Sequence, residues 1–253
     1  MTDPQSASKT PSPYPLPHEG RGIIAQGAPS QLSRVLEPEV MDTLADALDY
    51  DSMDHTEVNR RFVDDLFTAC AVSGETLGEM LDLGTGTAQI PIEICRRDHE
   101  VRIVAVDLSI SMLDVARNNL EIARATSQVM LDRVDAKRLP YADGRFAAVI
   151  SNSIIHHIPR PQAVLAEAVR VTAERGLLFF RDLLRPSDDD EVANLVATYA
   201  GEANPHQREL FENSLRAALS LDEIREVVAE LGFDPLMVQQ TSDRHWTWAA
   251  RKT

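Results

Sequence analysis

A glycine-rich turn with the composition of a ligand site follows the apolar segment Met80–Leu83 and opens a candidate helix. Its glycines, Gly84 and Gly86, allow turn conformations and let a ligand approach the main chain closely. If the apolar segment is a strand of a parallel sheet, the turn lies at its carboxyl end, where open α/β sheets bind ligands. An ordinary tight turn between a strand and a helix has the same composition, so the turn alone does not establish a site.

An acidic residue, Asp107, ends the next apolar segment, Val101–Val106, 23 residues after Gly84 (107 − 84). A carboxylate in this position accepts hydrogen bonds from the hydroxyl groups of a ribose. Its alternative role is at the N-terminus of the following helix, where Ser109 competes as the cap. The turn and the acid, on consecutive strands, together predict a ligand that contains a nucleoside.

The spacing within the turn disfavours NAD as that nucleoside. The dinucleotide fingerprint G-x-G-x-x-G/A requires a small residue three positions after the second glycine. In this chain that position holds Gln89, and the small residue comes one position earlier, at Ala88. A dehydrogenase is therefore the less favoured reading of the same geometry.

Short apolar segments alternate with candidate helices through the middle of the chain. This alternation predicts βαβ units and a Rossmann-like, doubly wound α/β fold with helices on both faces of a mostly parallel sheet. The expected strands are Met80–Leu83, Val101–Val106, Gln128–Leu131, Phe146–Ser151 and Gly176–Arg181, and the expected helices are 88–97, 111–125 and 161–173. The turn and Asp107 then lie at the same edge of the sheet.

The last third of the chain departs from this alternation. Residues 187–219 predict two helices with no strand between them, that is, a helical cap inserted above the sheet. Ser220 and Glu223 form a capping box that begins another helix. Strands follow at 234–240 and 245–250, and the short link between them predicts a hairpin and an antiparallel last strand.

The chain before the first strand divides into two parts. Residues 1–30 are rich in proline, serine and glycine and are predicted to form a disordered tail, because they bury too little apolar surface to offset the entropy of ordering. Residues 31–75 have apolar side chains at helical spacing and predict a helical lid over the edge or mouth of the sheet. The α/β domain then covers 76–253, with the inserted helices at 187–219.

The chain resembles the class I S-adenosylmethionine-dependent methyltransferases over about residues 78–250. The matching segments are MLDLGTGTA, AVDLSISML, DAKRLPYADGRFAAVISNSIIHHI and GLLFFRDLLRP. Within that superfamily it is similar to the small-molecule branch that includes the ubiquinone/menaquinone-type C-methyltransferases, and segments such as LEPEVMD and SDRHWTW resemble a bacterial subgroup of that branch. The resemblance implies methyl transfer from S-adenosylmethionine to a small molecule.

The resemblance also implies roles for individual residues. The implied cofactor-binding residues are Asp82, Gly84, Thr85, Gly86, Asp107, Leu108, Met112, Asp135, Ala136, Ser151, Asn152 and Arg61. The turn would lie under the methionine part, Asp107 would hold the ribose, and Asp135 would accept a hydrogen bond from the adenine amino group. An arginine of the lid would pair with the cofactor's carboxylate. Arg61 is the candidate named for this role, although the sequence does not choose between it and Arg60.

The sequence departs from the family's pattern at two places. Ala88 stands where a third glycine is usual, and its methyl group leaves less space within the turn. The fourth strand is followed by Ser151-Asn152-Ser153 instead of the Asn-Pro-Pro-Tyr or Asp-Pro-Pro-Tyr of amino-methyltransferases. The second departure disfavours N-methylation of nucleobases or of glutamine.

Two adjacent histidines, His156 and His157, follow the fourth strand and are the candidate catalytic bases. An imidazole has an ordinary pKa of about 6.5, which suits proton removal near neutral pH. The alternative is structural: one histidine caps the loop and the other packs in the core. Asp182 and Arg185 follow the fifth strand at the same edge, where either would contact substrate or hold the inserted helices in place; the alternatives are a surface acid and an arginine in an ion pair.

The composition restricts the partners and the compartment. The formal net charge is −15, which disfavours a nucleic-acid substrate. No apolar run is long enough for a membrane span, and Cys70 and Cys95 are expected to be buried free thiols, so a cytoplasmic location is predicted. No metal site is predicted: the acidic run from Asp188 to Glu191 is explained by a helix N-terminus. A non-methylating enzyme that uses the sulfonium cofactor and a cofactor-sensing module remain alternatives.

Overall fold

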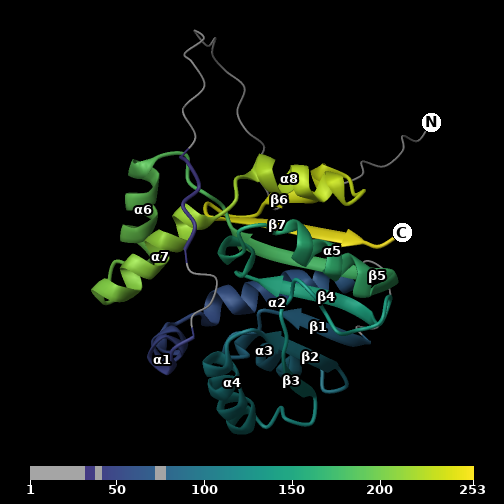
Figure 1. Ribbon diagram of the computed structural model, residues 1–253. Coiled ribbons are helices and arrows are strands. Elements are labelled where there is room, and N and C mark those ends of the chain that lie inside the picture. The colour runs from purple at the N-terminus through teal and green to yellow at the C-terminus, as the bar shows by residue number, and fades with distance from the viewer. Residues whose placement is uncertain (1–31, 38–41, 72–77) are drawn as a thin grey trace, which may run out of the picture.

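The computed structural model describes residues 32–37, 42–71 and 78–253, in which seven strands form one mixed sheet (Figure 1). The order across the sheet is β3-β2-β1-β4-β5-β7-β6, and β7 runs antiparallel to both of its neighbours. The strands are β1 Glu79–Leu83, β2 Arg102–Asp107, β3 Val129–Arg133, β4 Phe146–Asn152, β5 Thr172–Leu183, β6 Val238–Gln240 and β7 His245–Arg251. The predicted doubly wound fold with an antiparallel last strand is confirmed.

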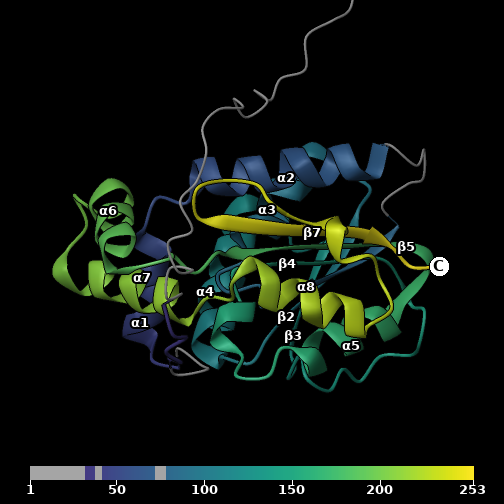
Figure 2. The same cartoon turned by 90° about the horizontal axis from the view of Figure 1, so that it is seen from above.

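Helices cover both faces of the sheet because side chains of successive strand residues point to opposite faces. On β1, Leu81 and Leu83 pack in one core with helices α5 (Gln162–Val171) and α8 (Leu221–Glu230). Met80 packs in the other core with α2 (Thr56–Ala71), α3 (Gln89–Arg97) and α4 (Ile110–Ala123). Figure 2 shows α2 and α3 on one side of the sheet and α5 and α8 on the other.

The order in which the chain adds strands to the sheet reverses between β1 and β4. The chain builds outward from β1 to β2 and β3, and then returns to add β4 on the other side of β1. The helices that follow β1 and β4, α3 and α5, therefore lie on opposite faces of the sheet, and the carboxyl ends of these strands are the usual ligand position in such sheets.

The N-terminal segment differs in part from the predicted helical lid. Residues 32–37 are extended: the backbone N–H of Leu32 bonds to Ser187 and that of Val35 bonds to Arg216. Helix α1 (Leu44–Ser52) packs beside α4 beyond the end of the sheet, whereas α2 lies flat on a sheet face through contacts such as Phe62 on Phe179. The predicted tail at 1–30 lies outside the described residues.

The inserted segment folds as two helices, α6 (Asp189–Tyr199) and α7 (Pro205–Ala217), with no strand between them. The acidic run does cap a helix, since the Asp188 side chain accepts a hydrogen bond from the Glu191 backbone N–H. Figures 1 and 2 both show α1, α6 and α7 together beyond one end of the sheet. The division into tail, lid and domain stays a prediction.

Two strands, β5 and β6, begin four residues away from their predicted starts (176 − 172 and 238 − 234). Strand β5 begins at Thr172, and its pairing with β4 shifts register between Phe146 and Ala148. Strand β6 is shorter than expected, because Asp234 caps a short 3-10 turn, η2 (Pro235–Met237), before it. Proline has no backbone N–H for a strand ladder, which explains the late start.

Both cysteines, Cys70 and Cys95, are buried and free, as predicted. None of the helices that the structure describes combines the length and the apolar character needed to cross a bilayer.

Trp248 on β7 is fully buried and contacts the rings of Phe180 and Phe233. We expect Trp248→Ala to lower the free energy of unfolding by about 3–5 kcal/mol, because it leaves a large cavity in the core. Urea denaturation measures this loss. Ile122→Ala, at an 82% exposed position, is the control, and an equal loss in both variants would contradict the packing described here.

Candidate functional site

A cavity opens at the carboxyl ends of β1, β2 and β4, at the reversal point of the sheet. Its walls come from the turn after β1, from the ends of β2 and β3, from the loop after β4, and from α1 and α2. Its lining residues include Tyr50, His55, Asn59, Asp82, Gly84, Thr85, Gly86, Thr87, Asp107, Leu108, Met112, Asp135, Ala136, Asn152, Ile154 and His157.

The glycine turn is held against the neighbouring strand. The backbone N–H groups of Gly84 and Thr85 both donate to the carbonyl of Val106, at 2.8 and 2.9 Å. Gly84 has a φ of +69°, and a Cβ built on it would lie 2.0 Å from Cγ2 of Ile154. Glycine is therefore required here both by the backbone conformation and by the close approach of the loop after β4.

Asp107 ties the turn to the end of β2. Its Oδ2 accepts from the Gly86 N–H and its Oδ1 accepts from the Ser109 N–H, each at 2.9 Å. Ser109 in turn caps α4 by accepting from the Met112 N–H. Each carboxylate oxygen keeps a second lone pair with which it can bind a ligand hydroxyl. Burial raises the pKa of Asp107, although the backbone donors oppose this effect.

Several buried polar atoms of the cavity have no hydrogen-bond partner among the residues that the structure describes. They are Oδ2 of Asp82, Oγ1 of Thr87 and Oδ1 of Asn152. Burial, with the negative charge of Asp107 nearby, raises the pKa of Asp82 to about 7. Buried polar groups in native proteins are nearly always paired, so this set indicates a ligand rich in donors.

Comparisons with known proteins identify the type of domain. Residues 81–180 match the family described as "Methyltransferase domain". The chain is 29% identical over 187 residues to malonyl-(acyl-carrier protein) O-methyltransferase of Geobacter sulfurreducens, covering 74% of this chain and 66% of that protein. It is 28% identical to the ubiquinone/menaquinone biosynthesis C-methyltransferase UbiE of Roseobacter denitrificans, covering 62% and 66%.

The shape of the chain agrees with the sequence matches. A SAM-dependent methyltransferase from Aquifex aeolicus superposes with a TM-score of 0.60 at 15% identity, over 83% of this chain and 99% of that one. Residues 81–180 are a class I S-adenosylmethionine-dependent methyltransferase domain. The aligned part spans at most 66% of the length of these two curated relatives.

The cavity of the methyltransferase domain fits S-adenosylmethionine. Oδ2 of Asp82, which has no partner among the described residues, could accept a hydrogen bond from the amino group of its methionine part. Gly86 has open space above it, since a Cβ there would meet only the ring of Tyr50 at 3.9 Å. The main chain of the turn is thus accessible to a ligand.

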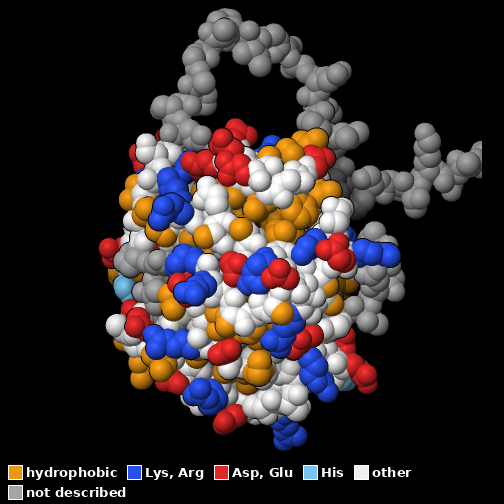
Figure 3. Space-filling model, turned by 45° about the vertical axis from the view of Figure 1, so that its right-hand side comes forward, with side chains coloured by type: hydrophobic (Ala, Val, Ile, Leu, Met, Phe, Trp, Pro, Cys, Tyr) orange, Lys and Arg blue, Asp and Glu red, His pale blue; other side chains and the backbone are white. Residues whose placement is uncertain are grey.

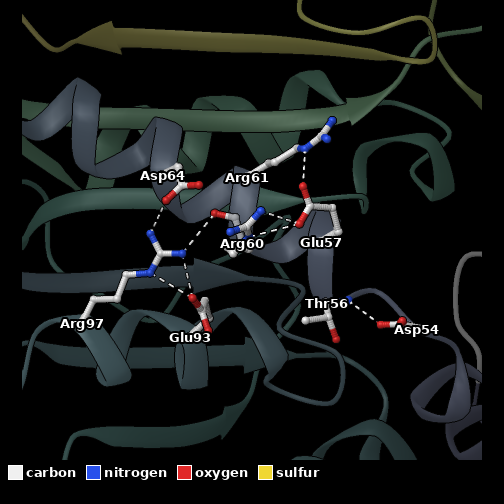
Figure 4. A network of polar contacts seen from close by, with 8 residues as sticks. All are labelled: Asp54, Thr56, Glu57, Arg60, Arg61, Asp64, Glu93 and Arg97. Carbon is white, nitrogen blue, oxygen red and sulfur yellow. Dashed lines mark hydrogen bonds and ion pairs between the residues drawn. The ribbon is translucent and has the colours of Figure 1, made fainter.

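The structure brings together all of the predicted cofactor-binding residues except Ser151 and Arg61. Ser151 is buried, and its hydroxyl donates to the carbonyl of Leu83, so it holds β4 against β1. The side chain of Arg61 is 71% exposed and pairs with Glu57 on its own helix (Figure 4). The structure does not bring Arg61 to the cavity.

The two histidines lie on a short 3-10 turn, η1 (Ile155–His157), and only His157 lines the cavity. His156 is buried, with its Nδ1 hydrogen-bonded to Oδ1 of Asp182. Asp182 is 1% exposed, so the alternative of a surface acid is wrong. Burial alone would raise the pKa of Asp182, but the positive charge of His156 and backbone donors from Leu183 and Ile155 hold it below its usual value.

The electrostatics of His156 follow from the same pair. Burial alone would lower its pKa, but the Asp182 carboxylate, with help from Glu37, outweighs burial and raises it. The alternative role for Arg185 is confirmed, since its guanidinium pairs with Glu223 and bonds to the carbonyl of Ala218. Arg185 therefore fixes the end of the inserted helices to α8.

Sequence reasoning missed residues that come from the N-terminal segment. His55 lines the cavity beside Tyr50, with ring centroids 5.0 Å apart. Glu37 lies between the two histidines, with Oε1 at 3.6 Å from Nε2 of His156 and 3.1 Å from Nδ1 of His157. Glu37 belongs to the segment LEPEVMD, which carried the family resemblance, but no periodicity or spacing connected it with the histidines.

Gly84 provides a direct test of the turn geometry. We expect Gly84→Ala to lower the free energy of unfolding by about 1–3 kcal/mol more than Gly144→Ala does, because a Cβ at 84 overlaps Ile154. Gly144 has a similar φ of +66°, but its Cβ would meet nothing closer than 3.8 Å. Equal losses in urea denaturation would show that backbone strain alone, and not the close approach of Ile154, explains the glycine.

Proposed function

We propose that the protein transfers a methyl group from S-adenosylmethionine to a small-molecule acceptor. The observation that carries the proposal is the buried cavity in which Asp82, the glycine turn and Asp107 follow one another across the ends of β1 and β2. The relatives named above, a malonyl-(acyl-carrier protein) O-methyltransferase and a C-methyltransferase of ubiquinone/menaquinone biosynthesis, support methyl transfer to such an acceptor.

Different lining residues suit the amino-acid, ribose and purine parts of the cofactor and the acceptor. The carboxylate of Asp82 faces the amino-acid end, and the Asp107 carboxylate offers free lone pairs to a ribose. Leu108 and Met112 provide an apolar wall next to Asp135 and Ala136, which suits a purine with an exocyclic amino group. Asn152 and His157 remain for the end that faces the acceptor.

Methyl transfer requires mainly that the protein position the acceptor atom against the methyl group. S-Adenosylmethionine supplies a methyl group on a positively charged sulfur, so the protein must align the acceptor and exclude water. Tyr50 and Asn59 approach from α1 and α2 and narrow the cavity on the side away from the sheet. Of the two adjacent histidines, His157 lines the cavity and would contact the acceptor there, while His156 is buried behind it.

The surface supports a small acceptor instead of a nucleic acid. On the face in Figure 3, lysine and arginine side chains are interspersed with aspartate and glutamate and form no basic patch. A net charge of −15 adds long-range repulsion of phosphate backbones. The buried free cysteines support the further proposal of a reducing, cytoplasmic location.

Titration calorimetry with S-adenosylmethionine, its demethylated product and NAD tests the proposal. We expect S-adenosylmethionine and its demethylated product to bind with a measurable heat. Asp107→Ala should weaken their binding free energy by about 1–3 kcal/mol, because the ribose hydroxyls lose a carboxylate acceptor. Asp114→Ala, in an exposed ion pair on α4, is the control and should bind normally. Binding of NAD alone would refute the proposal, and mass spectrometry of acceptor mixtures would distinguish methylation from other uses of the cofactor.

The raised pKa of Asp82 predicts pH-dependent binding. Below a pH of about 7 the carboxyl group is neutral in the free protein, and above it the group is charged and attracts the cationic cofactor. Affinity for S-adenosylmethionine should therefore rise between pH 5.5 and 7, by at most about tenfold per pH unit, and then level off. Calorimetry at several pH values measures this. Asp82→Asn should bind weakly with little pH dependence; a variant that retained the rise would assign it to another group.

A further inference from the structure

A second cluster of polar side chains lies at the acceptor end of the cavity. It is assembled from distant parts of the chain: Glu37 from the extended N-terminal segment, and His156 and His157 from η1. Arg34 fastens the segment there, because its guanidinium donates to the carbonyls of His156 and Ile158 at 3.0 Å and to that of Ala217 at 2.6 Å. The segment that carries Glu37 is therefore attached both to the loop after β4 and to the end of α7.

The three side chains converge on one point. One ligand atom from each, Oε1 of Glu37 and a ring nitrogen of each histidine, lies within 4.8 Å of the other two. Metal–ligand bonds of about 2.0–2.1 Å with near-tetrahedral angles separate two ligands by roughly 3.3 Å. The observed separations from Oε1, 3.1 and 3.6 Å, bracket this value.

The two ring nitrogens of His156 face different carboxylates. Asp182 takes the hydrogen bond of Nδ1 and also accepts from two backbone N–H groups. Nε2 points toward Oε1 of Glu37. A proton on Nε2 joins His156 to Glu37 alone, whereas a metal ion in place of that proton contacts Nε2, Oε1 of Glu37 and a ring nitrogen of His157 together.

The surroundings are those of a metal-binding histidine. Such histidines usually donate their second ring N–H to a carboxylate, as His156 does to Asp182. Ser214 on α7 donates to the same Oε1 and orients the carboxylate. Among the described residues no lysine or arginine forms an ion pair with Glu37, whose side chain is only 10% exposed. Burial accordingly raises the pKa of Glu37, with partial compensation from His156.

We propose that Glu37, His156 and His157 bind a divalent transition-metal ion at the acceptor end of the cavity. Two imidazoles and one carboxylate form the ligand set typical of zinc and of other first-row ions that keep positions open for an exogenous ligand. This set revises the expectation from the sequence that no residues ligate a metal.

The chemical role of the ion follows from its position. His157 lines the cavity, so an open coordination position can take an oxygen of the acceptor. The acceptor would then carry a hydroxyl, enol or carboxylate group, whose ionisation the ion promotes by lowering its pKa. This role rests on the proposed function, whereas binding of the ion does not.

Metal binding is tested with tag-free protein that has been treated with a chelator and dialysed. Zn²⁺ titration by calorimetry and elemental analysis after gel filtration should give one tight site per chain. Glu37→Gln and His157→Ala should each weaken the site by more than the roughly 10–100-fold that loss of an outer partner causes. His206→Ala is the matched control, because His206 is a half-exposed histidine 3.9 Å from Asp49 on the surface; its affinity should not change.

Further measurements separate loss of the metal site from loss of the fold. Circular dichroism and thermal unfolding of each variant show that it is folded, and Co²⁺ substitution reports nitrogen and oxygen ligands by its visible absorption. Absence of a tight site in the wild type, or equal affinity in Glu37→Gln, would overturn the proposal and leave a protonated His156 as the bridging charge. Calorimetry with the demethylated cofactor on metal-free protein tests the proposed function separately.

Discussion

The carboxylate of Asp107 holds together the two strand ends on which the cavity depends. One of its oxygens accepts a hydrogen bond from the backbone of the glycine turn and the other accepts one from the start of α4, so β1, β2 and their following helices share one partly buried carboxyl group. The arrangement is favourable because both donors are backbone N–H groups that would otherwise be unpaired near a helix N-terminus. A ligand that binds the remaining lone pairs meets a group whose position is already determined.

A second buried carboxylate, Asp182, organises the other end of the site. It accepts from the backbone N–H groups of Ile155 and Leu183 and from the ring of His156, and so joins the end of β5 to the loop after β4. Asp82 lies between these two anions with a pKa near 7. The three acids differ in their donors: backbone N–H groups oppose the effect of burial on the pKa of Asp107 and of Asp182, while Oδ2 of Asp82 lacks a partner among the described residues.

The family match does not contain all of the residues at the candidate site. Residues 81–180 contain the turn, Asp107, Asp135 and both histidines. Tyr50, Asn59 and Glu37 come from before this segment, and the inserted helices α6 and α7 come after it. Because the same fold supports many acceptors, the family match to residues 81–180 alone does not define the substrate.

The sequence by itself determined the features that depend on near neighbours. Strand alternation, the capping boxes, the glycine turn and the acid one strand later are local patterns, and they located the sheet, its carboxyl edge and most cavity residues. Only the tertiary structure decided that Arg61 faces solvent, that Asp182 is buried against His156, and that Glu37 meets both histidines. The physical reason is that these outcomes depend on how segments far apart in the chain pack against one another. An extended segment such as residues 32–37 has no hydrophobic periodicity that would identify the residues it contacts.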